Sequence, residues 1–133
     1  MIYLDTSAIV KLIRIEDESA ALVGWLNEQS GQPLVASALA EIELPRALRR
    51  SQPEVLSLVA AVLSRLHRVD INAAVRATAA AYVEPTLRTL DAIHLATAEF
   101  LVASGLQFTA FVTYDKRLAE AARRIGLPLT SPA

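Results

Sequence analysis

The first seven residues are the stretch that most constrains how this chain can fold. The apolar run Ile2-Tyr3-Leu4 ends abruptly in Asp5, and Thr6 and Ser7 then open an amphipathic segment that continues to Ile13. This order predicts a buried strand, a turn, and a helix whose N-terminus lies beside the Asp5 carboxylate. Because ligands of α/β proteins bind at the carboxyl ends of parallel strands, Asp5 is either a helix cap or a site residue. The stretch alone does not separate these two roles.

Short apolar runs alternate with helical segments along the rest of the chain. Further strands are expected at 34–36, 69–71 and 108–113, with an edge strand at 127–129. Helices are expected at 21–29, 37–50 with Ser37 as the cap, 53–66, 72–83, 89–104 and 115–126. Pro45, inside the helix expected at 37–50, implies a kink or a late start. The alternation predicts right-handed crossovers and an α/β fold with a parallel sheet and helices on both faces.

Composition sets the class of protein. The chain has 133 residues, which suits one domain with a substantial core. Its apolar fraction of 53% and mean hydropathy of +0.37 favour a buried subunit interface. The net charge of −1 produces no global field toward nucleic acid or membrane, and the absence of cysteine excludes disulfides and thiolate metal sites. With no signal peptide and no apolar run of spanning length, a cytoplasmic location is expected.

Two further aspartates have settings that suggest a site. Asp115 follows the apolar run 108–113 and precedes a helix, so central parallel strands would bring it to the same sheet edge as Asp5. Two independent helix caps are the alternative. Asp91 belongs to a helix that is apolar nearly all round, which predicts a central buried element. Since an uncompensated carboxylate there costs on the order of several kcal/mol, Asp91 is a candidate functional residue.

The helix after the second strand offers two glutamates, Glu41 and Glu43, which project to nearly opposite sides. Ala40 and Ala47 occupy helical positions next to Glu43, and Arg46 follows within one turn. Small neighbours suit an acid that faces a cleft. The pattern therefore favours Glu43 over Glu41.

Carboxylates gathered at one edge of a sheet repel one another and call for a cation. The chain offers two histidines and no cysteine, so the ligands would be oxygens. Oxygen ligands with several retained waters favour Mg²⁺ or Mn²⁺. No Gly-rich phosphate-binding loop accompanies the acids, which points to metal-assisted hydrolysis of a phosphodiester.

Other side chains have more than one interpretation. Arg46, Arg49 and Arg50 follow Glu43 and either bind RNA phosphates or form a solvated helix face. His94 lies one turn after Asp91 and is a metal ligand, a base or, by preference, a helix-packing residue. Trp25 fits a core or interface position better than a platform for stacking bases.

Four motifs in this order resemble those of PIN-domain ribonucleases, and most closely those of VapC toxins from bacterial toxin–antitoxin pairs. The motifs are Ile2–Ala8, Ser37 with Glu43–Leu48, Leu90–Ala98 and Phe111–Leu118. Each motif alone is weak, but together they span nearly the whole chain. Many relatives carry another residue where this chain has Pro45. The difference affects the expected geometry of the helix, not the assignment of Glu43. A fifth acid present in some PIN nucleases has no counterpart here.

The resemblance implies one PIN domain over residues 1–133, folded as a three-layer α/β/α sandwich around a central parallel sheet. It implies that Asp5, Glu43, Asp91 and Asp115 bind Mg²⁺ or Mn²⁺ and cleave RNA. Thr6, Ser7 and Thr113 would support this site. It also implies a toxin homodimer that a VapB-type antitoxin holds inactive.

Two other function classes remain open at this point. A signalling receiver domain is also an α/β fold with acids at strand ends, but it has adjacent acids after its first strand, where this chain has Asp5 alone. A catalytically inactive PIN-fold binding protein would lack one of the acids, and none is missing here. The metal-dependent endoribonuclease is therefore the favoured interpretation.

Overall fold

The computed structural model describes all residues from Met1 to Ala133. Its five strands are all parallel and lie in the order β3-β2-β1-β4-β5. They are β1 (Ile2–Leu4), β2 (Leu34–Ser37), β3 (His67–Val69), β4 (Ala110–Val112) and β5 (Leu129–Thr130). The helices are α1 (Thr6–Ile13), α2 (Ser19–Glu28), α3 (Ala40–Ser51), α4 (Val59–Ser64), α5 (Ala73–Ala81), α6 (Thr89–Ala103) and α7 (Lys116–Arg124), and the 3₁₀ helix η1 (Pro53–Leu58) precedes α4.

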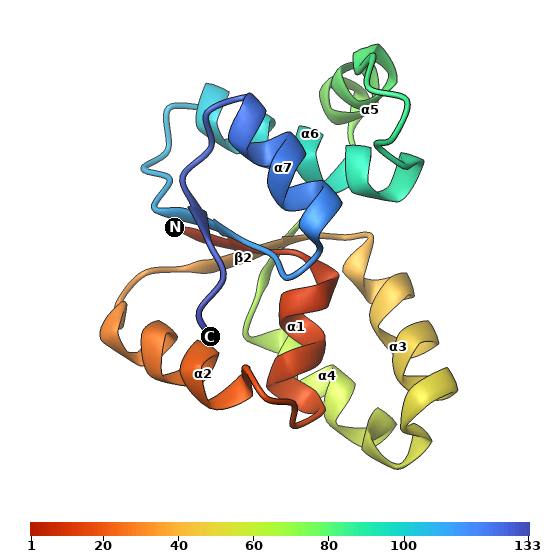
Figure 1. Ribbon diagram of the computed structural model, residues 1–133, viewed down its shortest axis with the longest axis vertical. Helices are drawn as coiled ribbons and strands as arrows, with labels where there is room; N and C mark the ends of the chain where they lie inside the picture. The colour runs from red at the N-terminus through yellow and green to blue at the C-terminus, as the bar shows by residue number, and fades with distance from the viewer.

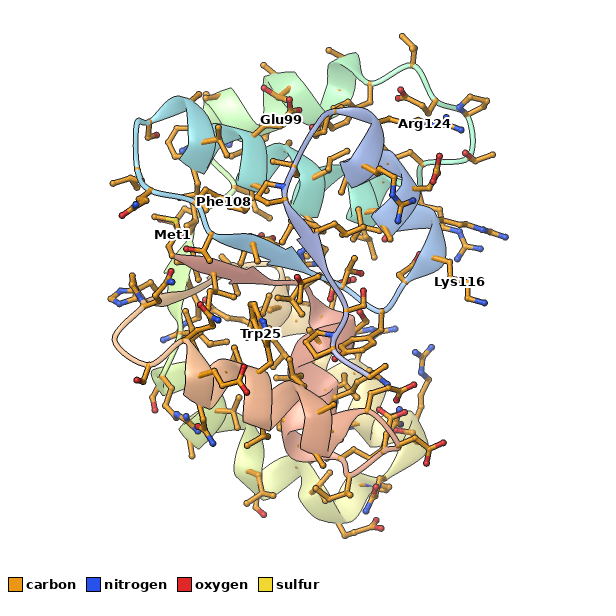
Figure 2. The ribbon with its side chains drawn as sticks, turned by 60° about the vertical axis from the view of Figure 1, so that its left-hand side comes forward. Met1, Trp25, Glu99, Phe108, Lys116 and Arg124 are labelled. Atoms are coloured by element: carbon orange, nitrogen blue, oxygen red, sulfur yellow. The ribbon has the colours of Figure 1, made fainter.

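The sheet lies between two helical layers, with α1 to α4 on one face and α5 to α7 on the other (Figure 1). Successive residues of β1 point to opposite faces, so Ile2 and Leu4 belong to the core under α1 and α3, whereas Tyr3 belongs to the core under α6 and α7. Trp25 on α2 packs against the first of these cores, as Figure 2 shows. The predicted α/β/α sandwich with a central parallel sheet is confirmed.

The order of the strands reverses beside β1. The chain leaves β1 toward β2 on one side, whereas β4 pairs with β1 on the other side. In open parallel sheets, ligands bind in the crevice where the order reverses, at the carboxyl ends of the strands. Asp5 directly follows β1, and Asp115 lies in the connection between β4 and α7. The topology therefore places both aspartates at this edge.

Two local predictions were wrong. Ser37 does not cap a helix, because it pairs as the last residue of β2 with Val69, and α3 begins three residues later at Ala40. The Ser37 hydroxyl instead accepts a hydrogen bond from the Leu39 amide in the turn between them (3.1 Å). The late start of α3 leaves Pro45 inside the helix.

The third strand is His67–Val69 rather than 69–71. It is an edge strand, and His67 and Arg68 are exposed, so its sequence carries no apolar run. The fourth strand is confirmed in a shorter form. The predicted edge strand forms as β5, starting at Leu129.

The long helix α6 is the element that the sequence described best. It begins at Thr89, as predicted, and Gly105 follows its end with φ of 78°, a left-handed conformation that glycine adopts without strain. Its buried residues include Ala92, Leu95 and Ala98. No helix in the structure combines the length and the apolar character needed to cross a bilayer.

Candidate active site

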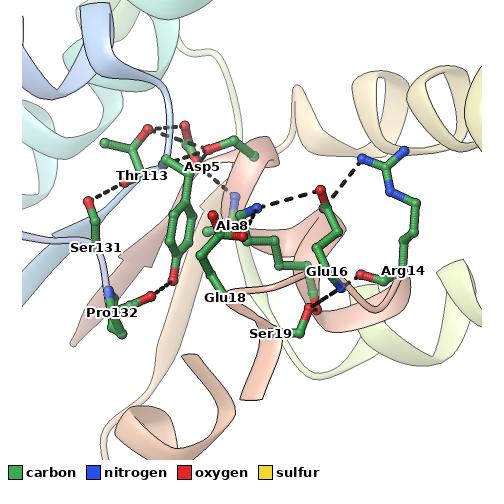
Figure 3. A network of polar contacts seen from close by, with 12 residues as sticks. Asp5, Ala8, Arg14, Glu16, Glu18, Ser19, Thr113, Ser131 and Pro132 are labelled. Atoms are coloured by element: carbon green, nitrogen blue, oxygen red, sulfur yellow. Dashed lines mark hydrogen bonds and ion pairs between the residues drawn. The ribbon is translucent and has the colours of Figure 1, made fainter. Parts of the chain in front are cut away.

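Asp5 is buried at the end of β1 and is held by donors from two elements. Its Oδ1 accepts hydrogen bonds from the Ala8 amide at 2.9 Å and the Ser7 hydroxyl at 2.7 Å, and its Oδ2 accepts one from the Thr113 hydroxyl at 2.5 Å. Figure 3 shows the contacts with Ala8 and Thr113. Asp5 therefore caps α1 and ties it to the segment after β4. Burial raises the pKa of Asp5, against the opposing effects of His94 and the three donors.

Asp115 caps α7 in a similar way but keeps one oxygen free. Its Oδ1 accepts hydrogen bonds from the backbone amides of Arg117 at 2.9 Å and Leu118 at 3.0 Å. Its Oδ2 accepts none. The helix cap and the site residue, which the sequence posed as alternatives, are thus compatible roles for both Asp5 and Asp115.

The two glutamates of α3 do face different surroundings. Glu43 Oε1 accepts a hydrogen bond from the Thr6 hydroxyl and lies 2.7 Å from both that oxygen and His94 Nε2. Glu41 lies 3.5 Å from an Arg68 guanidinium nitrogen, and its side chain is 45% exposed. The pKa of Glu43 lies below its ordinary value because the hydrogen bonds from His94 and Thr6 and the charge of His94 outweigh the upward effect of burial. Glu43 is thus the glutamate directed toward α1 and α6.

Asp91, in the first turn of α6, makes no side-chain hydrogen bond to the protein. Burial raises its pKa first, and the charge of Asp115 raises it further. Asp5 and Glu43 add smaller upward effects, which means that all four carboxylates lie close enough to influence Asp91. Asp91 and Asp115 also line one cavity of about 270 Å³. The structure thus brings the four predicted acids to one edge of the sheet.

The donor set fits a hard divalent cation. Asp91, Asp115 Oδ2 and Glu43 Oε2 accept no hydrogen bond from the protein, so oxygens at this edge are free for a ligand. No three acidic or histidine side chains are arranged to hold an ion together as they stand. Mg²⁺ commonly binds through one or two carboxylates and keeps several waters, so it does not need such a cage. Burial raises the pKa of both Asp5 and Asp91, and the charge of Asp115 raises that of Asp91 further, so a bound cation would favour the ionised form of both carboxylates.

Cationic side chains border the acids on two sides. Arg46 and Arg50 line a cavity of about 390 Å³ together with Thr6 and Glu43, whereas Arg49 does not line it. On the other side, the cavity that contains Asp91 and Asp115 is completed by three basic residues that the sequence analysis did not single out, namely Arg88, Lys116 and Arg117. Lys116 marks this side of the molecule in Figure 2. The available signal was their closeness to the acid motifs, since Arg88 lies two residues before Leu90–Ala98 and Lys116 and Arg117 lie within Phe111–Leu118.

Two other residues, His94 and Tyr3, make contacts at the site that the sequence did not predict. His94 is buried, as expected of a packing residue, but its ring also contacts Glu43 through Nε2 and Tyr3 through Nδ1, both at 2.7 Å. The sequence places Tyr3 in an apolar strand and assigns its hydroxyl no role. The spacing of His94 from Asp91 was a signal for the first residue, but nothing in the sequence pointed to the second.

Comparison with known proteins identifies the family of the chain. Residues 2–124 match the family model described as "PIN domain". The chain is 54% identical over 132 residues to Ribonuclease VapC35 of Mycobacterium tuberculosis, covering 99% of this chain and 97% of the relative.

Solved structures share the fold. Mycobacterium tuberculosis VapC20, described as a Sarcin-Ricin loop cleaving toxin, aligns with a TM-score of 0.71 at 16% identity over 96% of each chain. A toxin–antitoxin complex from Klebsiella pneumoniae aligns with a TM-score of 0.71 at 18% identity, covering 100% of this chain and 98% of that one. On the family match and the full-length identity, the chain belongs to the PIN-domain family and, within it, to the VapC ribonucleases.

Proposed function

We propose that this protein is a metal-dependent endoribonuclease that acts as the toxin of a VapBC-type toxin–antitoxin pair. The observation that carries the proposal is the meeting of Asp5, Glu43, Asp91 and Asp115 at the sheet edge where the strand order reverses, with free carboxylate oxygens. The 54% identity to a protein named Ribonuclease VapC35 supports RNA as the substrate class. The receiver-domain and inactive-protein alternatives have no observation in their favour.

The four acids would hold Mg²⁺ or Mn²⁺. When bound, the ion supplies a lowered pKa for the attacking water and neutralises negative charge on the scissile phosphate. Asp91 and Asp115 offer the least engaged oxygens. Hydrogen bonds from Ser7, Ala8 and Thr113 hold the Asp5 carboxylate, so it would meet the ion in a fixed orientation.

The basic side chains on both sides of the acids are proposed to bind the RNA backbone. Arg46 and Arg50 lie on one side of the acids, and Arg88, Lys116 and Arg117 lie on the other. Arginine and lysine contacts to phosphates provide much of the affinity of proteins for RNA and fix its position. In this proposal, the two groups bind phosphates on either side of the bond that is cut. Single-stranded or looped RNA suits a shallow open site, because its backbone can bend into it.

The proposed partners are a VapB-type antitoxin and a second copy of the chain. Exposed apolar side chains support protein contacts near the site, since Ile42 is 61% exposed, Leu90 is 47% exposed and both line the cavity that contains Glu43. An antitoxin bound there would cover the entrance to the acids. A toxin with an RNA substrate is proposed to act in the cytoplasm.

RNA cleavage by the purified, antitoxin-free protein tests the proposal. We expect Mg²⁺ or Mn²⁺ to be required, so that EDTA abolishes cleavage of a single-stranded RNA and added Mn²⁺ restores it. Cleavage that persists unchanged in EDTA would contradict the metal mechanism. The exposed acid Asp17 provides the matched control, because Asp17→Asn should behave like the wild type.

The two glutamates of α3 form an internal comparison. Glu43→Gln should lower RNA cleavage by about 100-fold or more, the loss typical of disturbing a metal site. Glu41→Gln removes a partly exposed ion pair worth at most about 1 kcal/mol of stability and should leave cleavage unchanged. Gel-based cleavage rates for both variants give the answer. A larger loss in Glu41→Gln would mean that α3 is rotated by half a turn.

Asp91 links the site to stability. Its pKa is raised in the folded protein, so its ionisation destabilises the fold. This loss is absent below the ordinary pKa of about 3.9 and becomes complete as pH rises through the raised folded pKa. The lowered pKa of Glu43 acts only below its ordinary value of about 4.3, so it does not offset this loss near neutral pH. We therefore expect the stability lost through Asp91 to increase as the pH of the metal-free protein rises above ~4.

Asp91→Asn removes this charge while keeping the shape of the side chain. The variant should melt higher than the wild type in EDTA near pH ~8, with a smaller difference near pH ~4, and it should not cut RNA. Mn²⁺ should raise the melting temperature of the wild type more than that of the variant, because it binds the folded acids. A variant that melts lower in EDTA and still cuts RNA would show that Asp91 is only structural.

A further inference from the structure

A chain of hydrogen bonds runs from the sheet core to the candidate site. The Tyr3 hydroxyl lies 2.7 Å from His94 Nδ1, and His94 Nε2 lies 2.7 Å from Glu43 Oε1. Tyr3 is fully buried and His94 is 3% exposed. Three residues from β1, α6 and α3 are thus linked over 91 positions of sequence.

Donor and acceptor chemistry allows one arrangement of protons along this chain when the ring is neutral. An ionised carboxylate only accepts hydrogen bonds, so His94 Nε2 must donate to Glu43. In a neutral imidazole the other nitrogen is then an acceptor, and the Tyr3 hydroxyl donates to Nδ1. Glu43 thereby fixes the tautomer, and the Tyr3 hydroxyl, which can donate or accept, holds the orientation of the ring through Nδ1.

Tyr3 is well suited to anchor such a chain because it cannot move easily. Its ring stacks on Phe111 of the neighbouring strand, with centroids 5.1 Å apart and planes within 4°. The two residues are also register partners in the pairing of β1 with β4. The rings of His94 and Tyr3 form a T-shaped pair, with centroids 6.0 Å apart and planes at 77°. The position of His94 is therefore set by the central strands.

The same chain determines which oxygen of Glu43 is available. His94 and the Thr6 hydroxyl both direct their hydrogen bonds to Oε1, while Oε2 receives none. An oxygen with two donors is occupied. The carboxylate is thus held with Oε2 as its free oxygen, whereas an unsupported glutamate would sample several rotamers.

We propose that Tyr3 is a positioning residue that acts through His94 to hold Glu43 in the orientation that binds the metal ion. This inference rests on the proposed function, because it assigns Glu43 to the metal site. Tyr3 itself touches neither metal nor RNA. A purely structural Tyr3 would satisfy its own buried hydroxyl and influence stability alone.

Mn²⁺ affinity separates these roles, measured by electron paramagnetic resonance on the full chain alongside thermal melting and RNA cleavage. Tyr3→Phe keeps the stacked ring and removes the hydroxyl. We expect its Mn²⁺ affinity to fall about 10-fold, the lower end of the range for residues that orient metal ligands. His94→Leu should lose about 100-fold, and His94→Gln should recover part of this, because its amide can donate to Glu43.

Tyr82→Phe is the matched control. It also removes a tyrosine hydroxyl, one that donates to Glu99 on the outer side of α6, so its Mn²⁺ affinity should equal that of the wild type. In a Glu43→Gln background, Tyr3→Phe should cause no further loss of Mn²⁺ affinity, since both changes interrupt the same chain of hydrogen bonds.

Tyr3→Phe with a lower melting temperature but wild-type Mn²⁺ affinity would overturn the inference, as would losses that add fully with Glu43→Gln. Failure of the proposed function has a different result, in which the wild type itself neither binds Mn²⁺ nor cuts RNA.

Discussion

The buried negative charge of Asp5 at the carboxyl end of β1 is the constraint on which the rest of this structure depends. Asp5 is 3% exposed, and the penalty for burying such a charge is on the order of several kcal/mol. Three hydrogen bonds to a charged group, each contributing about 1.5–3 kcal/mol, offset much of it. The pKa of Asp5 is nevertheless raised, so the protein donors leave a deficit that a cation would fill.

The donors that hold Asp5 also assemble the site. Ser7 binds Asp5 and accepts a hydrogen bond from the Tyr114 amide, which joins α1 to the connection after β4. Thr113 binds Asp5 and accepts from the Asp115 amide, so the two aspartates share one scaffold. A single network thus caps α1, positions the start of α7 and brings two acids together. If the site acts as proposed, stability and function have the same structural origin.

The sequence predicted what apolar periodicity and chain order encode. The strand–Asp–helix unit at Asp5, the length of α6 and the different surroundings of Glu41 and Glu43 all followed from local patterns. It failed where pairing between strands decides the outcome, as for Ser37, which is drawn into β2, and for the exposed edge strand β3. The link from Tyr3 to His94 was invisible because it joins residues 91 positions apart, and no local pattern encodes such a contact.

Anomalous diffraction from crystals grown with Mn²⁺ tests the central claim most directly. The account predicts a manganese peak at the sheet edge within coordination distance of the carboxylates of Asp91 and Asp115, on the side where Asp5 and Glu43 lie. Soaking in EDTA should remove the peak, and Asp91→Asn crystals should lack it. An RNA-cleaving protein whose crystals bind manganese only elsewhere, for example at the exposed His67, would contradict the account.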